Sequence, residues 1–84
     1  MRILKKYQGA VIKMKFKRLS KIKVPEEWYR PNIYKMLERV EYYARTHKYK
    51  VPIVVDRNNM LVDGYTSYLI AKGLNKKIVR VEVR

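Results

Sequence analysis

The amino-acid sequence predicts a small single α+β domain, with a short mixed sheet of four to five strands and two main helices. Residues 11–17 and 78–84 alternate apolar and polar side chains, as strands with one buried face do. Residues 31–46 repeat apolar side chains at the spacing of an amphipathic helix. Residues 50–74 have the pattern of a strand, a tight turn, a second strand and a helix. Strands and helices mixed within one short chain favour the α+β class.

The composition narrows the class of protein. A chain of 84 residues allows one small domain. It contains no cysteine, which excludes disulfides and thiolate metal sites. No apolar run approaches the ~20 residues of a membrane-spanning helix, and the start lacks the apolar core of a signal peptide. We therefore expect a cytoplasmic protein with no membrane partner.

The charge balance is strongly basic. There are 21 Lys and Arg against 7 Asp and Glu, a formal net charge of +14, and residues 1–25 contain no acidic side chain. Such a field attracts phosphate groups and favours a polyanion partner, with DNA the leading candidate. A charge balance does not separate DNA from RNA or from an acidic protein surface. The alternative without any partner is that the basic side chains only keep the protein soluble.

The N-terminal part of the chain divides at residue 10. We expect residues 1–10 to form an arm and residues 11–84 to form the domain. In the first predicted strand, one face is expected to be buried and carries Ile12, Met14 and Phe16. The lysines between them either form a solvated face that discourages edge pairing or a phosphate-contacting stripe. The basic residues of this stripe and its continuation are Lys13, Lys15, Lys17, Arg18, Lys21 and Lys23.

The middle of the chain predicts two helical segments. Pro25 with the acids that follow it suits the first turn of a short helix, and Trp28 is expected to cover the core. The long helix is expected from about Pro31 to Thr46, with its apolar stripe packed on the strands. That stripe consists of Ile33, Met36, Leu37, Val40, Tyr43 and Ala44. If so, replacing Met36 or Leu37 by Asp would largely unfold the domain.

The second half of the chain predicts a compact strand and helix unit. Ile53 to Val55 and Met60 to Val62 read as strands joined by a turn at Asp56–Asn59. Asp63 and Gly64 interrupt the second strand, and a helix can run from Tyr65 to Lys72. Gly73 followed by Leu74 predicts a left-handed glycine as the helix stop.

A known family carries the same pattern. The order Pro-Ile-Val-Val at residues 52–55, then Asp63 and Gly64, then Tyr68 and Ala71, resembles the ParB/sulfiredoxin superfamily, often described as ParB-like nuclease domains. The resemblance implies the fold and a phosphate site at the helix start. This sequence departs from the family pattern at residues 64–67, which are Gly-Tyr-Thr-Ser where ParB proteins have Gly-Glu-Arg-Arg. The cysteine of sulfiredoxins and the histidines of the related free-serine kinases are also missing.

The predicted helix start is the candidate site. Free backbone N–H groups at a helix N-terminus bind anions, so the phosphate-binding candidates are Gly64, Tyr65, Thr66 and Ser67. Asp63 has two interpretations. It caps the helix by accepting the N–H of Tyr65 or Thr66, or, as the best catalytic candidate, it holds a metal such as Mg²⁺ or orients a hydroxyl. The sequence contains no other arrangement typical of catalysis, and no other cofactor or metal site is expected.

The tyrosines add a weaker signal for nucleic acid. Tyr7, Tyr29 and Tyr49 lie among basic residues and could stack on bases, whereas the core or site-lining candidates are Tyr42, Tyr43, Tyr65 and Tyr68.

The leading hypothesis is a basic DNA-binding module of ParB-like fold with a phosphate-binding helix start. The nucleic-acid candidates are Lys13, Lys15, Lys17, Arg18, Lys21, Lys23, Lys76, Lys77 and Arg80. One alternative is a ParB-like nuclease or nucleotide-dependent phosphoryl-transfer enzyme acting through Asp63, with a nucleotide or phosphate as ligand. The other is a small accessory or phage-type protein that binds an acidic protein. Sequence preference and oligomeric state stay open.

Overall fold

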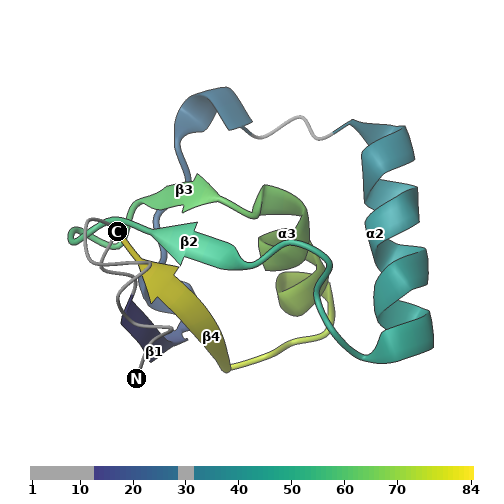
Figure 1. The fold of residues 1–84 in the computed structure, drawn as a ribbon. Helices are drawn as coiled ribbons and strands as arrows, with labels where there is room; N and C mark the ends of the chain where they lie inside the picture. Colours follow the sequence, from purple (N-terminus) through teal and green to yellow (C-terminus); the bar gives the residue numbers. More distant parts are fainter. Residues whose placement is uncertain (1–12, 29–31) are drawn as a thin grey trace, which may run out of the picture.

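A computed structural model describes residues 13–28 and 32–84 (Figure 1). The predicted arm (residues 1–10), Ile12 and Pro31 lie outside these described residues. The strands are β1 (Lys13–Arg18), β2 (Ile53–Val55), β3 (Leu61–Asp63) and β4 (Ile78–Val83), and the helices are α2 (Ile33–Thr46) and α3 (Tyr65–Gly73). Two short 3-10 helices follow β1, namely η1 (Leu19–Lys21) and η2 (Glu26–Trp28).

The four strands form one mixed sheet in the order β1-β4-β2-β3. β4 pairs antiparallel with β1 and parallel with β2, while β2 pairs antiparallel with β3. The predicted α+β class, with a short mixed sheet and two main helices, is confirmed. None of the helices among the described residues has the length and hydropathy needed to cross a bilayer.

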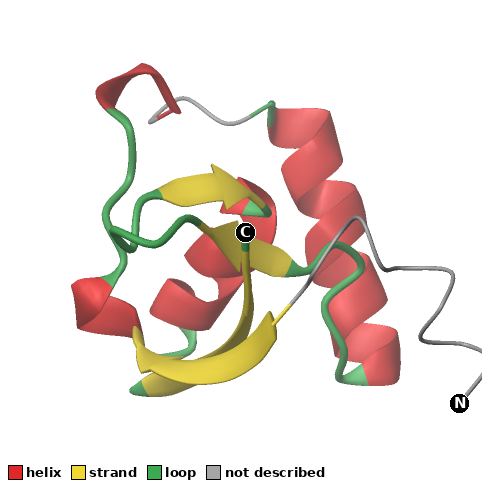
Figure 2. Ribbon diagram, turned by 60° about the vertical axis from the view of Figure 1, so that its left-hand side comes forward, coloured by secondary structure: helices red, strands yellow, loops and turns green. Residues whose placement is uncertain are grey.

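The core lies between the sheet and α3, which covers one sheet face (Figures 1 and 2). Its buried side chains are Leu19, Ile22, Ile53, Val55, Leu61, Ala71, Val79 and Val81. Val79 and Val81 are buried while Ile78 and Arg80 between and beside them are exposed, which confirms the alternation predicted for the last strand. Trp28 packs partly buried against this core, as expected.

The burial predicted for β1 is wrong. Met14 is 45% exposed and Phe16 is 76% exposed. Residues paired across antiparallel strands share a face, and Lys15 and Lys17 pair with the buried residues Val81 and Val79. The lysines therefore lie on the core side of the sheet, at an edge strand that extends beyond the cover of α3.

The packing predicted for the long helix is also wrong. α2 begins at Ile33, one residue after Asn32, whose side-chain oxygen accepts the N–H groups of Tyr34 and Lys35. None of its fourteen residues is buried, and Leu37 is 60% exposed. α2 packs against α3 instead of the sheet (Figure 2), because α3 already occupies the sheet face.

The turns follow the predicted chemistry with one shift. The Asp56 carboxylate accepts the N–H groups of Asn58 and Met60 at 2.8 and 3.0 Å, which confirms Asp56 as a turn residue. α3 ends at Gly73. The left-handed residue that follows the helix lies two positions later than predicted: it is Asn75, with φ of 58°, and not Gly73. The N–H of Asn75 bonds the Lys72 carbonyl, and the N–H of Lys76 bonds the Ala71 carbonyl, which completes a Schellman motif.

Candidate functional site

The start of α3 is built around Gly64. This residue is buried and has φ of +83°, a conformation that favours glycine. A Cβ at this position would lie 2.1 Å from the Pro52 carbonyl oxygen. The space left by the missing side chain is therefore filled by the chain itself, not held open for a phosphate.

The neighbours of Gly64 also differ from the sequence interpretation. The Asp63 carboxylate accepts the N–H of Gly64 at 2.8 Å, so the predicted cap to Tyr65 or Thr66 is not formed. Ser67 is 1% exposed, and its hydroxyl donates to the Val51 carbonyl. That hydroxyl anchors α3 to the segment before β2. The first-turn groups that remain near the surface are those of Tyr65 and Thr66, both half-buried.

The predicted basic residues do not form one surface. Lys15 and Lys17 lie on the α3 side of the sheet, whereas Arg80 pairs with Phe16 on the opposite side. Lys21 is exposed in η1, and Lys23 is exposed beside β3, where its backbone bonds Asn59 and Leu61. The side chain of Lys13 lies outside the described residues.

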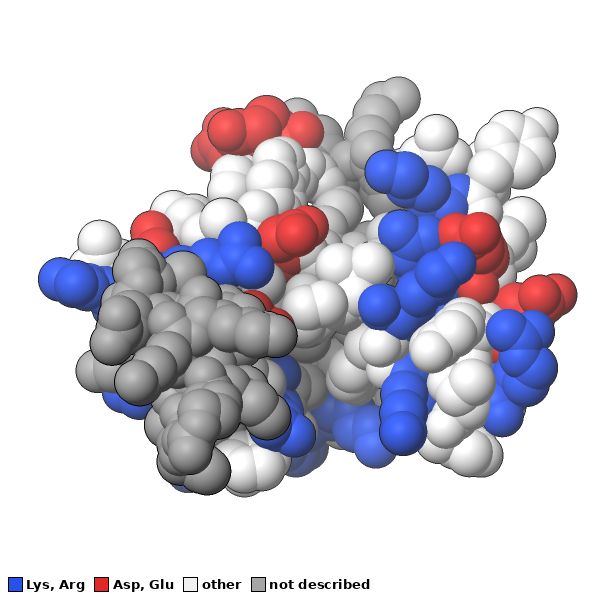
Figure 3. All heavy atoms as spheres, in the orientation of Figure 1, with Lys and Arg blue, Asp and Glu red and all other residues white. Residues whose placement is uncertain are grey.

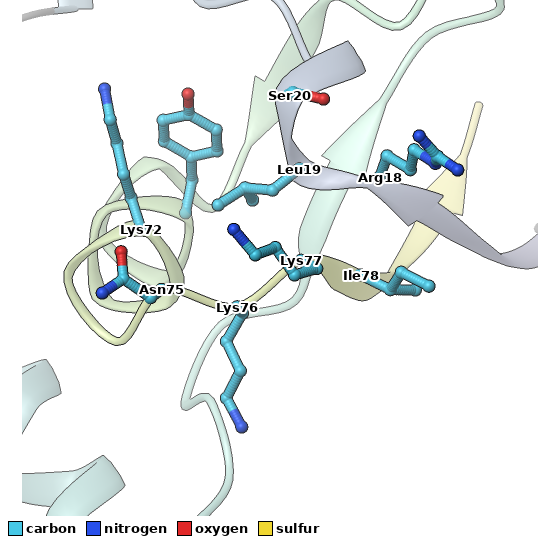
Figure 4. Close-up of a pocket in the computed structure, with 9 residues that line it drawn as sticks. Arg18, Leu19, Ser20, Lys72, Asn75, Lys76, Lys77 and Ile78 are labelled. Atoms are coloured by element: carbon cyan, nitrogen blue, oxygen red, sulfur yellow. The ribbon is translucent and has the colours of Figure 1, made fainter.

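Three of the predicted residues line one pocket, together with one that sequence reasoning missed. Arg18, Lys76 and Lys77 belong to the lining of a pocket of about 640 Å³ between η1 and the C-terminal end of α3. In Figure 4 the Lys77 side chain points into this space, whereas those of Arg18 and Lys76 extend away from it. The missed residue is Lys72, one helical turn after Tyr68 on the same face of α3. The four-residue spacing from Tyr68 and the nearby Lys76 and Lys77 are the sequence signals that could have identified Lys72. The pocket, called the basic pocket below, is lined by Arg18, Leu19, Ser20, Tyr68, Lys72, Asn75, Lys76, Lys77 and Ile78.

The basic pocket carries positive charge without local compensation. No acidic side chain lines it. Within residues 13–28 and 32–84, the basic partners of the ion pairs are Arg39, Arg45, Lys50 and Arg84, none of which lines the pocket. Figure 3 shows acidic side chains at the top over η2, over α2 and near the middle of the view, with basic side chains at the left, over α2 and along the lower edge. An anion that enters the pocket meets no nearby carboxylate.

Aromatic rings lead from η2 toward the pocket. Trp28 and Tyr65 have ring centroids 6.1 Å apart, and Tyr65 stacks on Tyr68 at 6.4 Å with an interplanar angle of 18°. Tyr65 and Tyr68 pack against the core, which confirms their predicted role.

Tyr49 is a different case. It also packs against the core and lies 5.1 Å from the ring of Tyr43, and burial raises its pKa, with Tyr43 adding to the effect. Its stacking on bases stays a prediction, for a ring that is half-buried; Tyr7 and Tyr29 lie outside the described residues.

The sequence contains a single histidine. His47 ends α2 in a left-handed conformation and is exposed. In the part of the chain that the structure describes, no three His, Asp or Glu side chains gather into a group that could hold a metal ion. The described geometry therefore offers cation clusters and aromatic rings, which bind anions and planar groups.

This chain is similar to known proteins in its fold. No protein-family model matches the sequence, and no curated protein matches it. Among solved structures, a Pnob8-like ParB N-domain in its C2221 form is 27% identical, with a TM-score of 0.69 over 87% of this chain. A second structure of a pNOB8-like ParB N-domain is also 27% identical, with a TM-score of 0.68 over 87% of this chain.

These matches define the class of fold. The chain is a small α+β domain with a four-stranded mixed sheet, and its fold is that of ParB N-domains, which confirms the predicted ParB-like fold. It spans 29% and 27% of the length of the two matched chains.

Proposed function

We propose that this chain is a nucleic-acid-binding module, with DNA the favoured partner, that holds phosphates at the C-terminal end of α3. The observation that carries the proposal is the basic pocket, whose lining includes Arg18, Lys72, Lys76 and Lys77 and no acidic residue. The likeness to ParB N-domains is consistent with it.

Electrostatics supply the driving force. A phosphate backbone that meets several lysines and arginines releases its condensed counterions, which favours binding at low salt. Lys15 and Lys17 on β1 precede Arg18 directly and extend the basic surface from the pocket along the edge of the sheet. Arg80 lies on the opposite sheet face and would contribute to steering rather than to this contact.

The start of α3 is a second, weaker phosphate contact in this proposal. The N–H groups of Tyr65 and Thr66 lie in the first turn, where no carbonyl of the same helix can accept them. The contact lacks the arginines that ParB proteins carry, so it would hold one phosphate weakly and free nucleoside triphosphates poorly. Thr66→Val, which replaces the hydroxyl by a methyl group, should weaken phosphate binding here without changing stability.

The test is a salt titration of DNA binding, followed by the fluorescence anisotropy of a labelled duplex. If the contact neutralises four to six phosphates, log affinity should fall against log salt with a slope of about −4 to −5. Replacing Lys72, Lys76 and Lys77 together by Gln should make the slope shallower by about 3.

The matched control removes three exposed charges elsewhere, through Lys35→Gln, Lys48→Gln and Arg57→Gln. It should leave the slope within about one unit of the wild-type value. Equal effects of the two triple variants would place the contact away from the pocket. No binding to any nucleic acid at low salt would overturn the proposal.

The two alternatives are separate outcomes of the same measurements. Cleavage that needs Mg²⁺ and is lost in Asp63→Asn with folding intact would identify the enzyme. Displacement of DNA by polyglutamate at equal charge concentration would identify an acidic protein as the partner. No observation on the described residues favours either one.

A further inference from the structure

The basic pocket has features that a phosphate contact alone does not need. Its volume of about 640 Å³ lies within the range of sites that hold small molecules. Leu19, 8% exposed, gives it an apolar floor, and Tyr68 contributes an aromatic wall. Asn75 and Ser20 add an amide and a hydroxyl. An apolar floor, an aromatic ring and hydrogen-bonding groups beside several cations match a nucleobase joined to its phosphate.

The aromatic wall is held in place before any ligand arrives. Tyr68 is half-buried, packs against the core and stacks on Tyr65, which in turn contacts Trp28. A ring fixed in this way loses little conformational freedom when a base packs against it. Base–aromatic stacking is tolerant of sequence, because every base has a π-face.

The cations differ in where they point. In Figure 4, the Lys77 ammonium points into the space between Leu19 and the end of α3. The Lys76 side chain extends away from that space on the other side of the loop. Lys72 lies one turn beyond Tyr68 on α3. Lys72 and Lys77 both line the pocket together with Tyr68.

We propose that the basic pocket takes one unpaired nucleotide of a single strand, with its base against Tyr68 and Leu19 and its phosphate at Lys72 and Lys77. This inference rests on the proposed nucleic-acid binding. In a duplex, the base faces are covered by neighbouring bases and only edges and backbone reach a protein. A duplex can therefore contact the rim of the pocket, whereas an unpaired nucleotide can enter it.

The experiment compares a labelled ten-nucleotide oligothymidylate with a labelled duplex at one salt concentration, using the whole chain. Tyr68→Leu should weaken single-strand binding by about fivefold or more, and leave duplex binding within about twofold. Lys77→Gln should weaken single-strand binding clearly more than Lys76→Gln does. These two lysines are adjacent and carry the same charge, so Lys76→Gln controls for charge alone.

A second readout covers the case in which Tyr68→Leu unfolds, which thermal melting will show. Titration of the wild-type chain with the oligothymidylate should shift the NMR signals of Tyr68, Lys72 and Asn75 but not those of α2. Equal affinity for single strand and duplex, with equal effects of the two lysine variants, would overturn this inference and leave the proposed function standing. No binding of either nucleic acid would overturn both. Competition by free thymidine monophosphate at the same nucleotide concentration would assign the pocket to a free nucleotide instead of a strand.

Discussion

Gly64 shows how closely one residue can be constrained by a distant part of the chain. Its φ of +83° and the 2.1 Å that would separate a Cβ from the Pro52 carbonyl oxygen act together. Ser67, three residues later, bonds the Val51 carbonyl through its hydroxyl. The junction of β3 and α3 is thus fastened to residues 51–52 at two points, and the residue types at these positions serve the fold.

Gly64→Ala is expected to lower the free energy of unfolding by about 2–4 kcal/mol, because left-handed strain adds to steric overlap. Urea denaturation measures it. Gly73→Ala is the control: nothing lies within 4 Å of a Cβ at that helical position, so stability should stay the same or rise by up to about 1 kcal/mol. A Gly64→Ala variant as stable as the wild type would mean that the junction relaxes freely.

At the scale of elements, α2 is the outer layer of the fold. It contacts α3, none of its residues is buried, and its apolar residues Ile33, Leu37 and Val40 are exposed. The sheet and α3 therefore make the core without it.

Leu37→Asp should accordingly cost no more than about 1 kcal/mol, mostly through the lower helix propensity of Asp. Val81→Asp, at a fully buried position of β4, should unfold the domain, because an unpaired buried charge exceeds the stability of so small a protein. Circular dichroism during thermal melting distinguishes the two. Unfolding by Leu37→Asp would show that α2 belongs to the core after all.

There are physical reasons why the buried face was predicted correctly for some elements and wrongly for others. Alternation at residues 11–17 predicts a strand, but a period of two marks two faces and does not say which one α3 will cover. The apolar stripe on α2 correctly predicts a helix. It does not predict what the helix packs against, because the sheet face is covered by α3. Val79 and Val81 were predicted correctly because β4 lies inside the sheet, where covered and uncovered faces differ most.

The candidate site was predictable in part for similar reasons. Arg18, Lys76 and Lys77 follow from the charge runs, but the sequence gives no sign that they line one pocket, since η1 and the end of α3 lie more than fifty residues apart. Gly64 was assigned to a ligand because an intruding Pro52 carbonyl cannot be seen without the fold.

At the scale of the whole molecule, the net charge of +14 repels itself in the folded state. Raising NaCl from 10 to 200 mM should therefore increase the melting temperature by several degrees, where about 4–8 °C corresponds to about 1 kcal/mol in a domain of this size. Replacing Lys72, Lys76 and Lys77 by Glu lowers the net charge by six, from +14 to +8. That variant should melt at a higher temperature in low salt and respond less to added salt. A melting temperature that falls with salt would show that ion pairs outweigh repulsion.

The position of β4 sets an order of events during synthesis. Among the described strands, β4 comes latest in the sequence, yet it is the one that pairs with β1, and it separates β1 from β2. A growing chain can form the β2–β3 hairpin and α3 early, because their contacts are local. The pairing of β1 with β4 must wait until residues 78–83 have been made, and closing so long a loop makes this pairing slow. During that wait the backbone edge of β2 that β4 will cover is open to any other extended segment, so the nascent chain is most vulnerable to mispairing just before β4 appears.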